Sequence, residues 1–255
     1  MTTRTTKRPA GEPTWIDLAT PDVEAAKSFY KQIFGWNFFD TGEDFGHYQF
    51  ALAQGRSAAG IGPMQPGSPM PSAWTVYFAT ENAATDVERV KALGGQVYAD
   101  VMAIGDSGKM AICADPTGAV FGLWEAENHI GSAVEGEPGS MGWCEVNTND
   151  AAAACDFYGK LYNLTPNKMD GMNYYIMQRG DQMICGVSQM DGAWQGFPPH
   201  WMGYFNVENT DATLEQITAA GGKVYSPAFD TPYGRMAVVT DPFGAAFSIV
   251  QPPQA

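Results

Sequence analysis

The sequence lacks any apolar run long enough to cross a bilayer, and its first dozen residues, MTTRTTKRPAGE, lack the apolar segment of a secretory signal. We therefore expect a loose N-terminal tail and a cytoplasmic protein. Basic residues are also few, because 14 Lys and Arg stand against 28 Asp and Glu, giving a formal net charge of −14. This charge repels nucleic acid and anionic membranes and attracts cations, so neither of the first two is expected as a partner. An alternative is that the acidity only keeps the protein in solution.

Patterns typical of metal sites and catalytic nucleophiles are missing as well. The cysteines have no CxxC spacing, and three of the four lie among apolar neighbours, which predicts buried free thiols in a reducing compartment (Cys113, Cys144, Cys155 and Cys185). The histidines share no ligand spacing and are interpreted as surface or internally paired side chains (His47, His129 and His200). Residues 105–108, Gly-Asp-Ser-Gly, match a serine-nucleophile tetrapeptide, but the corresponding residues 230–234 contain no serine, so we interpret them as a turn.

The chain does contain a long internal repeat. Trp15, Asp17 and Asp22 return 128 residues later as Trp, Glu and Asp, and the pair Phe29-Tyr30 returns at the same offset. Tyr77-Phe78 returns after 127 residues, and the motif Asp-Pro-x-Gly at 115–118 returns after 126. The repeat predicts two modules, each with its own core. We assign residues 1–12 to the tail, 13–127 to the first module, 128–140 to a linker rich in Gly and Glu, and 141–255 to the second module.

Each module has the pattern of a strand, a helix, strands, a second helix and further strands. Residues 15–19 alternate between aliphatic and other side chains, which predicts a strand, and apolar residues at helical spacing predict a helix over 23–34. Further strands are expected at 48–53, 58–64, 74–79, 96–101, 110–114 and 119–124, with a helix over 83–93, and the order repeats after residue 141. The fold class is therefore α+β with a mostly antiparallel sheet.

Several of these motifs together are typical of one superfamily. A strand and helix joined at Asp22, then Phe29-Tyr30, Phe34-Gly35-Trp36 and Asp115-Pro116-Thr117-Gly118, resemble the vicinal-oxygen-chelate superfamily of glyoxalases, bleomycin-resistance proteins and extradiol dioxygenases. The second copy has all but Phe-Gly-Trp, and the chain is similar to two-module actinobacterial glyoxalase-like proteins. The resemblance implies a tandem repeat of βαβββ modules, in which curved, mostly antiparallel sheets enclose a cavity.

The resemblance also implies where metal ligands would lie. In metal-dependent members they come seven residues before the Asp that opens the helix and seven after the Asp of Asp-Pro-x-Gly. Here those positions hold residues that bind zinc, nickel or iron poorly (Trp15, Gly122, Trp143 and Ser248). We therefore expect no metal ion and no other cofactor. Asp17 and Glu145, two residues further along the first strands, would make at most a site for a hard cation.

The same positions indicate a binding site of another kind. Trp15 and Trp143 would face the cavity beside Asp17 and Glu145, so that indole rings stack on a flat ligand and carboxylates attract its positive charge. Alternatively, the tryptophans only fill the volume of a lost metal site and the acids are solvated. Our candidate ligand-binding residues are Trp15, Asp17, Gly122, Trp124, Trp143, Glu145 and Ser248, with hydroxyls from some of Tyr48, Tyr174, Tyr175, Tyr204 and Tyr233.

Three functions remain open at this point. The first is a metal-independent protein that sequesters an aromatic, cationic small molecule. The second is a glyoxalase-like or hydroxylase-like enzyme acting on a small carbonyl or aromatic substrate, with Asp17 or Glu145 as general base and no catalytic residue otherwise assigned. The third is a vestigial cavity in a protein whose surface binds another protein. A second copy of the chain is a candidate partner.

Overall fold

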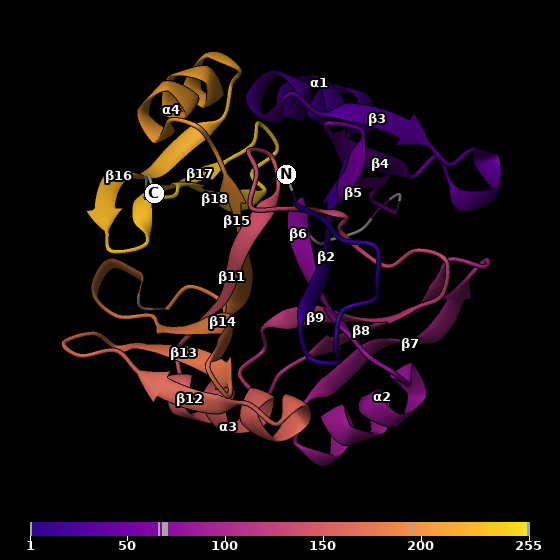
Figure 1. The fold of residues 1–255 in the computed structure, drawn as a ribbon, viewed down its shortest axis with the longest axis vertical. Coiled ribbons are helices and arrows are strands. Elements are labelled where there is room, and N and C mark those ends of the chain that lie inside the picture. Colours follow the sequence, from indigo (N-terminus) through magenta and orange to yellow (C-terminus); the bar gives the residue numbers. More distant parts are fainter. Residues whose placement is uncertain (1, 66, 68–70, 195, 254–255) are drawn as a thin grey trace.

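The computed structural model describes residues 2–65, 67, 71–194 and 196–253. Within these residues each repeat builds one eight-stranded curved sheet, and the two sheets stand side by side (Figure 1). The order is β3-β4-β5-β2-β6-β9-β8-β7 in the first sheet and β12-β13-β14-β11-β15-β18-β17-β16 in the second. The helices lie outside, with α1 beside α4 and α2 beside α3 (Figure 1).

The strands and α-helices of the two repeats correspond one to one, whereas the short 3-10 helices η1 and η2 lie at different places. The first repeat consists of β2 (Pro13–Thr20), α1 (Val23–Phe34), β3 (Asn37–Asp40), η1 (Glu43–Phe45), β4 (Gln49–Ala53), β5 (Arg56–Pro63), β6 (Ala73–Ala79), α2 (Ala83–Ala92), β7 (Gln96–Ile104), β8 (Gly108–Ala114) and β9 (Val120–Ala126). The second consists of β11 (Met141–Thr148), α3 (Ala151–Tyr162), β12 (Thr165–Lys168), β13 (Tyr174–Arg179), β14 (Gln182–Gln189), η2 (Gly192–Trp194), β15 (His200–Asn206), α4 (Thr210–Ala219), β16 (Lys223–Thr231), β17 (Gly234–Thr240) and β18 (Ala246–Gln251).

Each sheet joins two βαβββ units edge to edge. In the first sheet β2 pairs with β6 antiparallel, whereas β2 with β5 and β6 with β9 run parallel. The second sheet has the same arrangement, and the remaining pairs in both sheets are antiparallel. This confirms the predicted α+β class and the repeat of βαβββ modules with mostly antiparallel sheets. Strands β3 and β12 were not predicted.

The helices begin and end where the sequence supplies caps. The side chain of Asp22 accepts a hydrogen bond from the backbone N–H of Ala25 at 2.9 Å, and Gly35 ends α1 with φ +67°. Asp150 caps α3 in the same way. Asn163 replaces the glycine at the end of α3 with φ +55°, a conformation that asparagine tolerates better than most residues. The second copy therefore keeps the turn without the Phe-Gly-Trp motif.

The expectation of a separate core in each module was wrong. Buried residues from both repeats form one continuous cluster, in which Tyr30 contacts Phe247 at 5.7 Å between ring centroids and Trp74 contacts Phe205 at 5.2 Å. The reason is that β6 and β15 pack directly on each other. Gly203 on β15 also lets this strand approach β2, because a Cβ there would lie 2.4 Å from Cδ1 of Ile16.

The family motifs themselves join the two repeats. Tyr30 donates a hydrogen bond to Oδ2 of Asp241 at 3.2 Å, and Tyr158 donates one to Oδ2 of Asp115 at 2.9 Å. Trp74 and Trp201 donate from their indole nitrogens to the hydroxyls of these two tyrosines. The Phe-Tyr helix of one repeat thus holds the Asp-Pro-x-Gly turn of the other.

The N-terminal residues are packed rather than loose. Thr2–Thr3 (β1) pairs with Val134–Glu135 (β10), and Gly11 donates its backbone N–H to the carbonyl of Ala79 at 2.8 Å. The residues before the second repeat make the equivalent contact, since Gly139 donates its backbone N–H to the carbonyl of Asn206. Each repeat is therefore preceded by a segment that hydrogen bonds to the central strands. Among the described residues, no helix is long and apolar enough to span a membrane.

Candidate functional site

The first sheet encloses a cavity of about 640 Å³. Strand alternation on β2 turns Trp15 and Asp17 into it, while Ile16 and Leu18 enter the core behind the sheet. The walls are rich in aromatic rings, and polar groups are few. The rings come from Trp15, Phe39, Phe45, Phe50 and Trp124, and the titratable groups from Asp17, Asp44, Tyr48, Tyr77 and His129.

A chain of hydrogen bonds orders the floor of this cavity. The indole Nε1 of Trp15 donates to the hydroxyl of Tyr48 at 2.9 Å, and Tyr48 donates to Oδ2 of Asp17 at 3.3 Å. Tyr77 also hydrogen bonds to the Asp17 carboxyl. Burial raises the pKa of Asp17 to about 7, although the bonds from Tyr77 and Tyr48 oppose that rise. The carboxyl is therefore poised between its neutral and charged forms near neutral pH.

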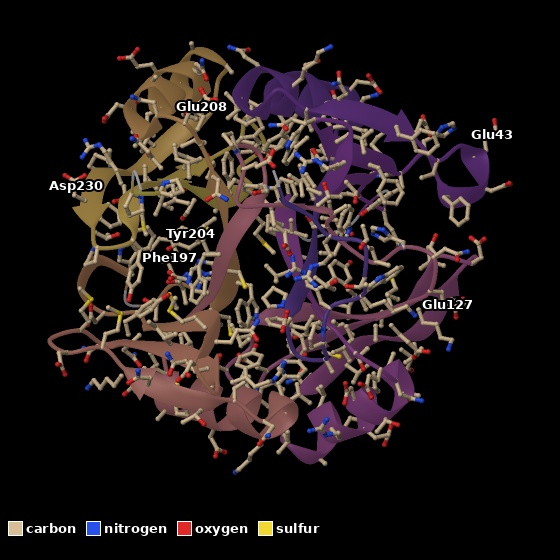
Figure 2. The ribbon with its side chains drawn as sticks, in the orientation of Figure 1. Glu43, Glu127, Phe197, Tyr204, Glu208 and Asp230 are labelled. Atoms are coloured by element: carbon tan, nitrogen blue, oxygen red, sulfur yellow. The ribbon has the colours of Figure 1, made fainter. Side chains whose placement is uncertain are left out.

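The second repeat keeps the same four groups. Trp143 donates from Nε1 to the hydroxyl of Tyr174 at 2.9 Å, and Tyr204 donates to Oε1 of Glu145 at 2.8 Å. Burial raises the pKa of Glu145, opposed by its bonds from Tyr204, Tyr174 and Asn147. Tyr204 lies on the side of the second sheet that faces away from the first repeat (Figure 2). Each sheet thus carries a hydrogen-bonded network of one tryptophan, one acid and two tyrosines on its inner face, which is the face opposite the shared core.

Glycines leave room for the tyrosines of these networks. A Cβ at Gly60 would lie 1.7 Å from the hydroxyl of Tyr48, and one at Gly186 would lie 2.0 Å from that of Tyr174. Gly122, one of the predicted ligand-binding positions, lies beneath Tyr77, because its Cβ would be 2.0 Å from the ring. Ser248 is the equivalent residue in the second repeat; it is buried and paired with Tyr204 across the strands.

Three aromatic wall residues of the first repeat have no aromatic equivalent in the second. Phe39, Phe50 and Trp124 correspond in the repeat register to Asn167, Ile176 and Val250. The two inner faces therefore share a polar floor but differ in their walls. Glu43 and Glu127 lie at the outer edge of the first repeat (Figure 2).

His129 belongs to the cavity, which sequence reasoning did not predict. Its ring stands edge-to-face on Trp15 at 4.5 Å between centroids, and it contacts Phe50 at 4.9 Å and Trp124 at 5.4 Å. Burial lowers the pKa of His129 to about 4, so the imidazole is neutral. Its Nε2 is buried and has no hydrogen-bond partner among the described residues. No motif marks this histidine; its backbone bond to Ser107 fixes its place.

The positions that the resemblance implies for metal ligands do not fit a metal here. Two of them are tryptophans, one is a serine and one is a glycine without a side chain (Trp15, Trp143, Ser248 and Gly122). In the part of the chain that the structure describes, no three His, Cys, Asp or Glu side chains gather in a group that could hold a metal ion. Asp17 instead has tyrosine hydroxyls as neighbours, which stabilise a carboxylate but do not complete a coordination shell.

Two paired βαβββ sheets, each enclosing its own polar floor, define a two-module protein of the vicinal-oxygen-chelate type. A sequence model of the Glyoxalase/Bleomycin resistance protein/Dioxygenase superfamily matches residues 13–123 and 140–249, and the chain belongs to that superfamily.

Relatives of similar length share this organisation. The chain is 40% identical over 250 residues to "Putative glyoxylase CFP32" of Mycobacterium tuberculosis, covering 95% of each chain. It is 37% identical over 259 residues to "Anthracycline biosynthesis protein DnrV" of Streptomyces peucetius, covering 94% of this chain and 93% of the relative.

Solved structures share the fold at low sequence identity. The Mn(II)-bound glyoxalase from Novosphingobium aromaticivorans has a TM-score of 0.67 at 13% identity, covering 95% of this chain and 82% of the other. The 2,3-dioxygenase LapB from Pseudomonas sp. KL28 has a TM-score of 0.62 at 12% identity, covering 98% and 94%. These similarities concern the fold alone.

Proposed function

We propose that the cavity of the first repeat binds a flat aromatic small molecule that carries positive charge, without a metal ion, and that the protein sequesters this molecule. The observation that carries the proposal is the lining of the cavity, where the rings of Trp15, Phe45 and Trp124 surround the single floor carboxyl of Asp17. Aromatic walls gain free energy by stacking and by burying apolar area. A carboxylate at the floor, with Asp44 in the wall, adds attraction for a cation.

The size and charge of the protein support the same class of ligand. A cavity of about 640 Å³ lies within the usual range for sites that enclose a drug-sized molecule. The formal charge of −14 draws cations toward the surface. One relative is named as an anthracycline biosynthesis protein, and anthracyclines are planar polycyclic compounds.

Titration calorimetry with proflavine, a planar cation, tests the proposal, with neutral acridone as the uncharged probe. We expect proflavine to bind more tightly than acridone and to lose affinity as salt rises. Asp17→Asn should weaken proflavine binding about tenfold, which is about 1.4 kcal/mol, and Phe45→Ala should weaken both probes. The matched control is Glu145→Gln, the same change in the second repeat, where the equivalents of Phe39, Phe50 and Trp124 are not aromatic. It should leave proflavine binding unchanged. Equal effects of Asp17→Asn and Glu145→Gln would refute this assignment.

A second candidate function is proton transfer, and one observation favours it. Asp17 has a pKa of about 7, the value at which a general base is most effective near neutral pH. In the reaction, a carboxylate oxygen of Asp17 would take a proton from a carbon next to a carbonyl group. The electron pair of the broken C–H bond would move to the carbonyl oxygen and leave an enolate.

Deuterium incorporation tests the enzymatic alternative. 1-Tetralone, an aromatic ketone of two fused rings, is incubated with the protein in D₂O, and exchange at the carbon beside its carbonyl is followed by NMR. Exchange accelerated by the protein and abolished in Asp17→Asn would support catalysis. Tight proflavine binding without any accelerated exchange would leave sequestration as the better account.

A further inference from the structure

Two turns of the first sheet meet at the rim of the aromatic cavity. One is the β3–β4 hairpin, which carries η1, and the other is the β7–β8 turn; both point to the outer edge of the first repeat (Figure 1). Phe45 of the first turn and Gly105 of the second both line the cavity. They lie so close that a Cβ at Gly105 would be 2.9 Å from Cζ of Phe45. Because the side chain of Phe45 is nevertheless 43% exposed, this contact lies between the cavity and solvent.

Both turns are longer in the first repeat than in the second. Between the last pairs of β3 and β4 lie eight residues, 41–48, and between those of β12 and β13 lie six, 169–174. Between the last pairs of β7 and β8 lie three residues, 105–107, and between those of β16 and β17 lie two, 232–233. The extra residues therefore occur in the repeat with the aromatic cavity, at the two places that meet over it.

The segment around η1 is held by its own hairpin. In the part of the chain that the structure describes, the hydrogen bonds of residues 43–47 all end within residues 40–49. Gly42 and Gly46 flank η1 with φ +85° and +63°, and glycine absorbs large backbone changes at low cost. On its far side Phe45 meets a glycine, which has no side chain to interlock with the ring. The segment can therefore turn away without breaking a hydrogen bond to the rest of the sheet.

We propose that residues 42–46 form a gate over the first cavity. The gate is closed when the ring of Phe45 rests on Gly105, and it opens when the segment turns about Gly42 and Gly46. This inference rests on the function proposed above, since the gate admits and retains the same flat cation. Glu43 and Asp44 lie on the gate, so it presents negative charge to an entering cation. A closed gate slows release of the ligand, as sequestration requires.

Stopped-flow fluorescence with proflavine tests the gate. A wall that only touches the ligand affects dissociation, whereas a gate that must open first also limits association. We therefore expect the observed association rate of the natural protein to level off at the opening rate as proflavine is raised. Gly105→Asn should hold the gate open, because asparagine tolerates the φ of +55° and its side chain takes the place of the Phe45 ring. Association and dissociation should both become about tenfold faster, with no plateau.

Two further variants complete the kinetic test. The matched control is Gly180→Asn in the second repeat, where φ is +58° and an added Cβ meets nothing within 4 Å. It places the same residue in the same backbone conformation away from the cavity, and it should leave both rates unchanged. Phe45→Ala changes a partly exposed side chain, so the protein should fold even if Gly105→Asn does not. It should accelerate association as well as dissociation.

A measurement without ligand tests the motion itself. In protein labelled with ¹³C at Cζ of phenylalanine, the Phe45 signal is assigned by its disappearance in Phe45→Leu. NMR relaxation dispersion detects exchange on the microsecond to millisecond timescale, on which such segments open. We expect exchange at Phe45 in the natural protein and in Gly180→Asn, and none in Gly105→Asn.

The two measurements separate failure of the gate from failure of the proposed function. Exchange at Phe45 without any proflavine binding would support the gate and contradict the proposed ligand. Proflavine binding with the same association rate in the natural protein, Gly105→Asn and Phe45→Ala would overturn the gate and leave the ligand in place. A single Phe45 signal without exchange would also overturn the gate.

Discussion

Asp17 is the residue on which the chemistry of the first cavity depends. Strand alternation predicted that Asp17 shares a face with Trp15, and both line the cavity. Tyr48 was one of the candidate cavity hydroxyls, but Tyr77 was not, because it comes from another strand and its contact with Asp17 depends on the sheet register. A usable signal existed: Tyr48, Tyr77 and Gly60 all return in the second repeat, at offsets of 126 and 127. His129 gave no such signal.

The ionisation of Asp17 gives a pH prediction. Its pKa in the folded protein, about 7, lies above its ordinary value of 3.8, so folding favours the protonated form. The resulting stabilisation is complete below pH 3.8 and is lost as the pH rises through 7. At 1.36 kcal/mol per pKa unit, the loss reaches about 4 kcal/mol at most.

Urea unfolding at pH 4.5 and pH 8 measures this effect. Asp17→Asn cannot ionise, so its free energy of unfolding should fall less than that of the natural protein between the two pH values. Glu145→Gln should behave in the same way, because burial also raises the pKa of Glu145. An identical pH dependence in the natural protein and Asp17→Asn would show that Asp17 does not titrate in this range.

Gly60 gives a second prediction at the scale of residues. A Cβ there would overlap the hydroxyl of Tyr48, so Gly60→Ala should displace Tyr48 from Asp17 and lower proflavine affinity about tenfold, since a hydrogen bond to a charged group contributes about 1.5–3 kcal/mol. Gly186→Ala is the matched control, because it displaces Tyr174 in the other sheet. It should cost similar stability but leave proflavine binding intact. Equal loss of binding in both variants would contradict this role.

At the scale of elements, the sequence predicted most helices and strands within a few residues. The helices were clear because caps and apolar spacing agree, as in α1. Strands β3 and β12 escaped notice because they are short edge strands with little buried surface; all four residues of Thr165–Lys168 are exposed and one is proline. Their identity follows only from pairing with β4 and β13.

A third prediction concerns the hydrogen bonds that join the two repeats, such as the one between helix α1 and the turn after β17. Tyr30→Phe removes the donor to the buried carboxyl of Asp241, and Tyr158→Phe does the same to Asp115. Each change should lower the free energy of unfolding by about 1–3 kcal/mol. Tyr98→Phe is the control, since its side chain is 59% exposed. Chemical denaturation measures all three, and a cost no larger than that of the control would show that the hydroxyls do not join the repeats.

At the scale of the whole molecule, the internal repeat predicted the number of modules but not that the two modules share one core. The packing of the two sheets depends on the residues on their core faces, such as Ile16 against Gly203. These residues would be apolar or small whether or not the two sheets packed together. Because one core spans both repeats, we expect a single cooperative unfolding transition. Circular dichroism and tryptophan fluorescence should report the same urea midpoint. Two separated transitions would indicate that the repeats are independent.

The central claim is that the first cavity holds an aromatic cation by stacking and by the carboxylate of Asp17, without a metal ion. The most direct measurement is a crystal structure of chelator-treated protein with proflavine bound. The account predicts the acridine ring between Trp15, Phe45 and Trp124, with an amino group toward Asp17. Proflavine bound outside this cavity, or a metal ion needed among its side chains for binding, would contradict the account.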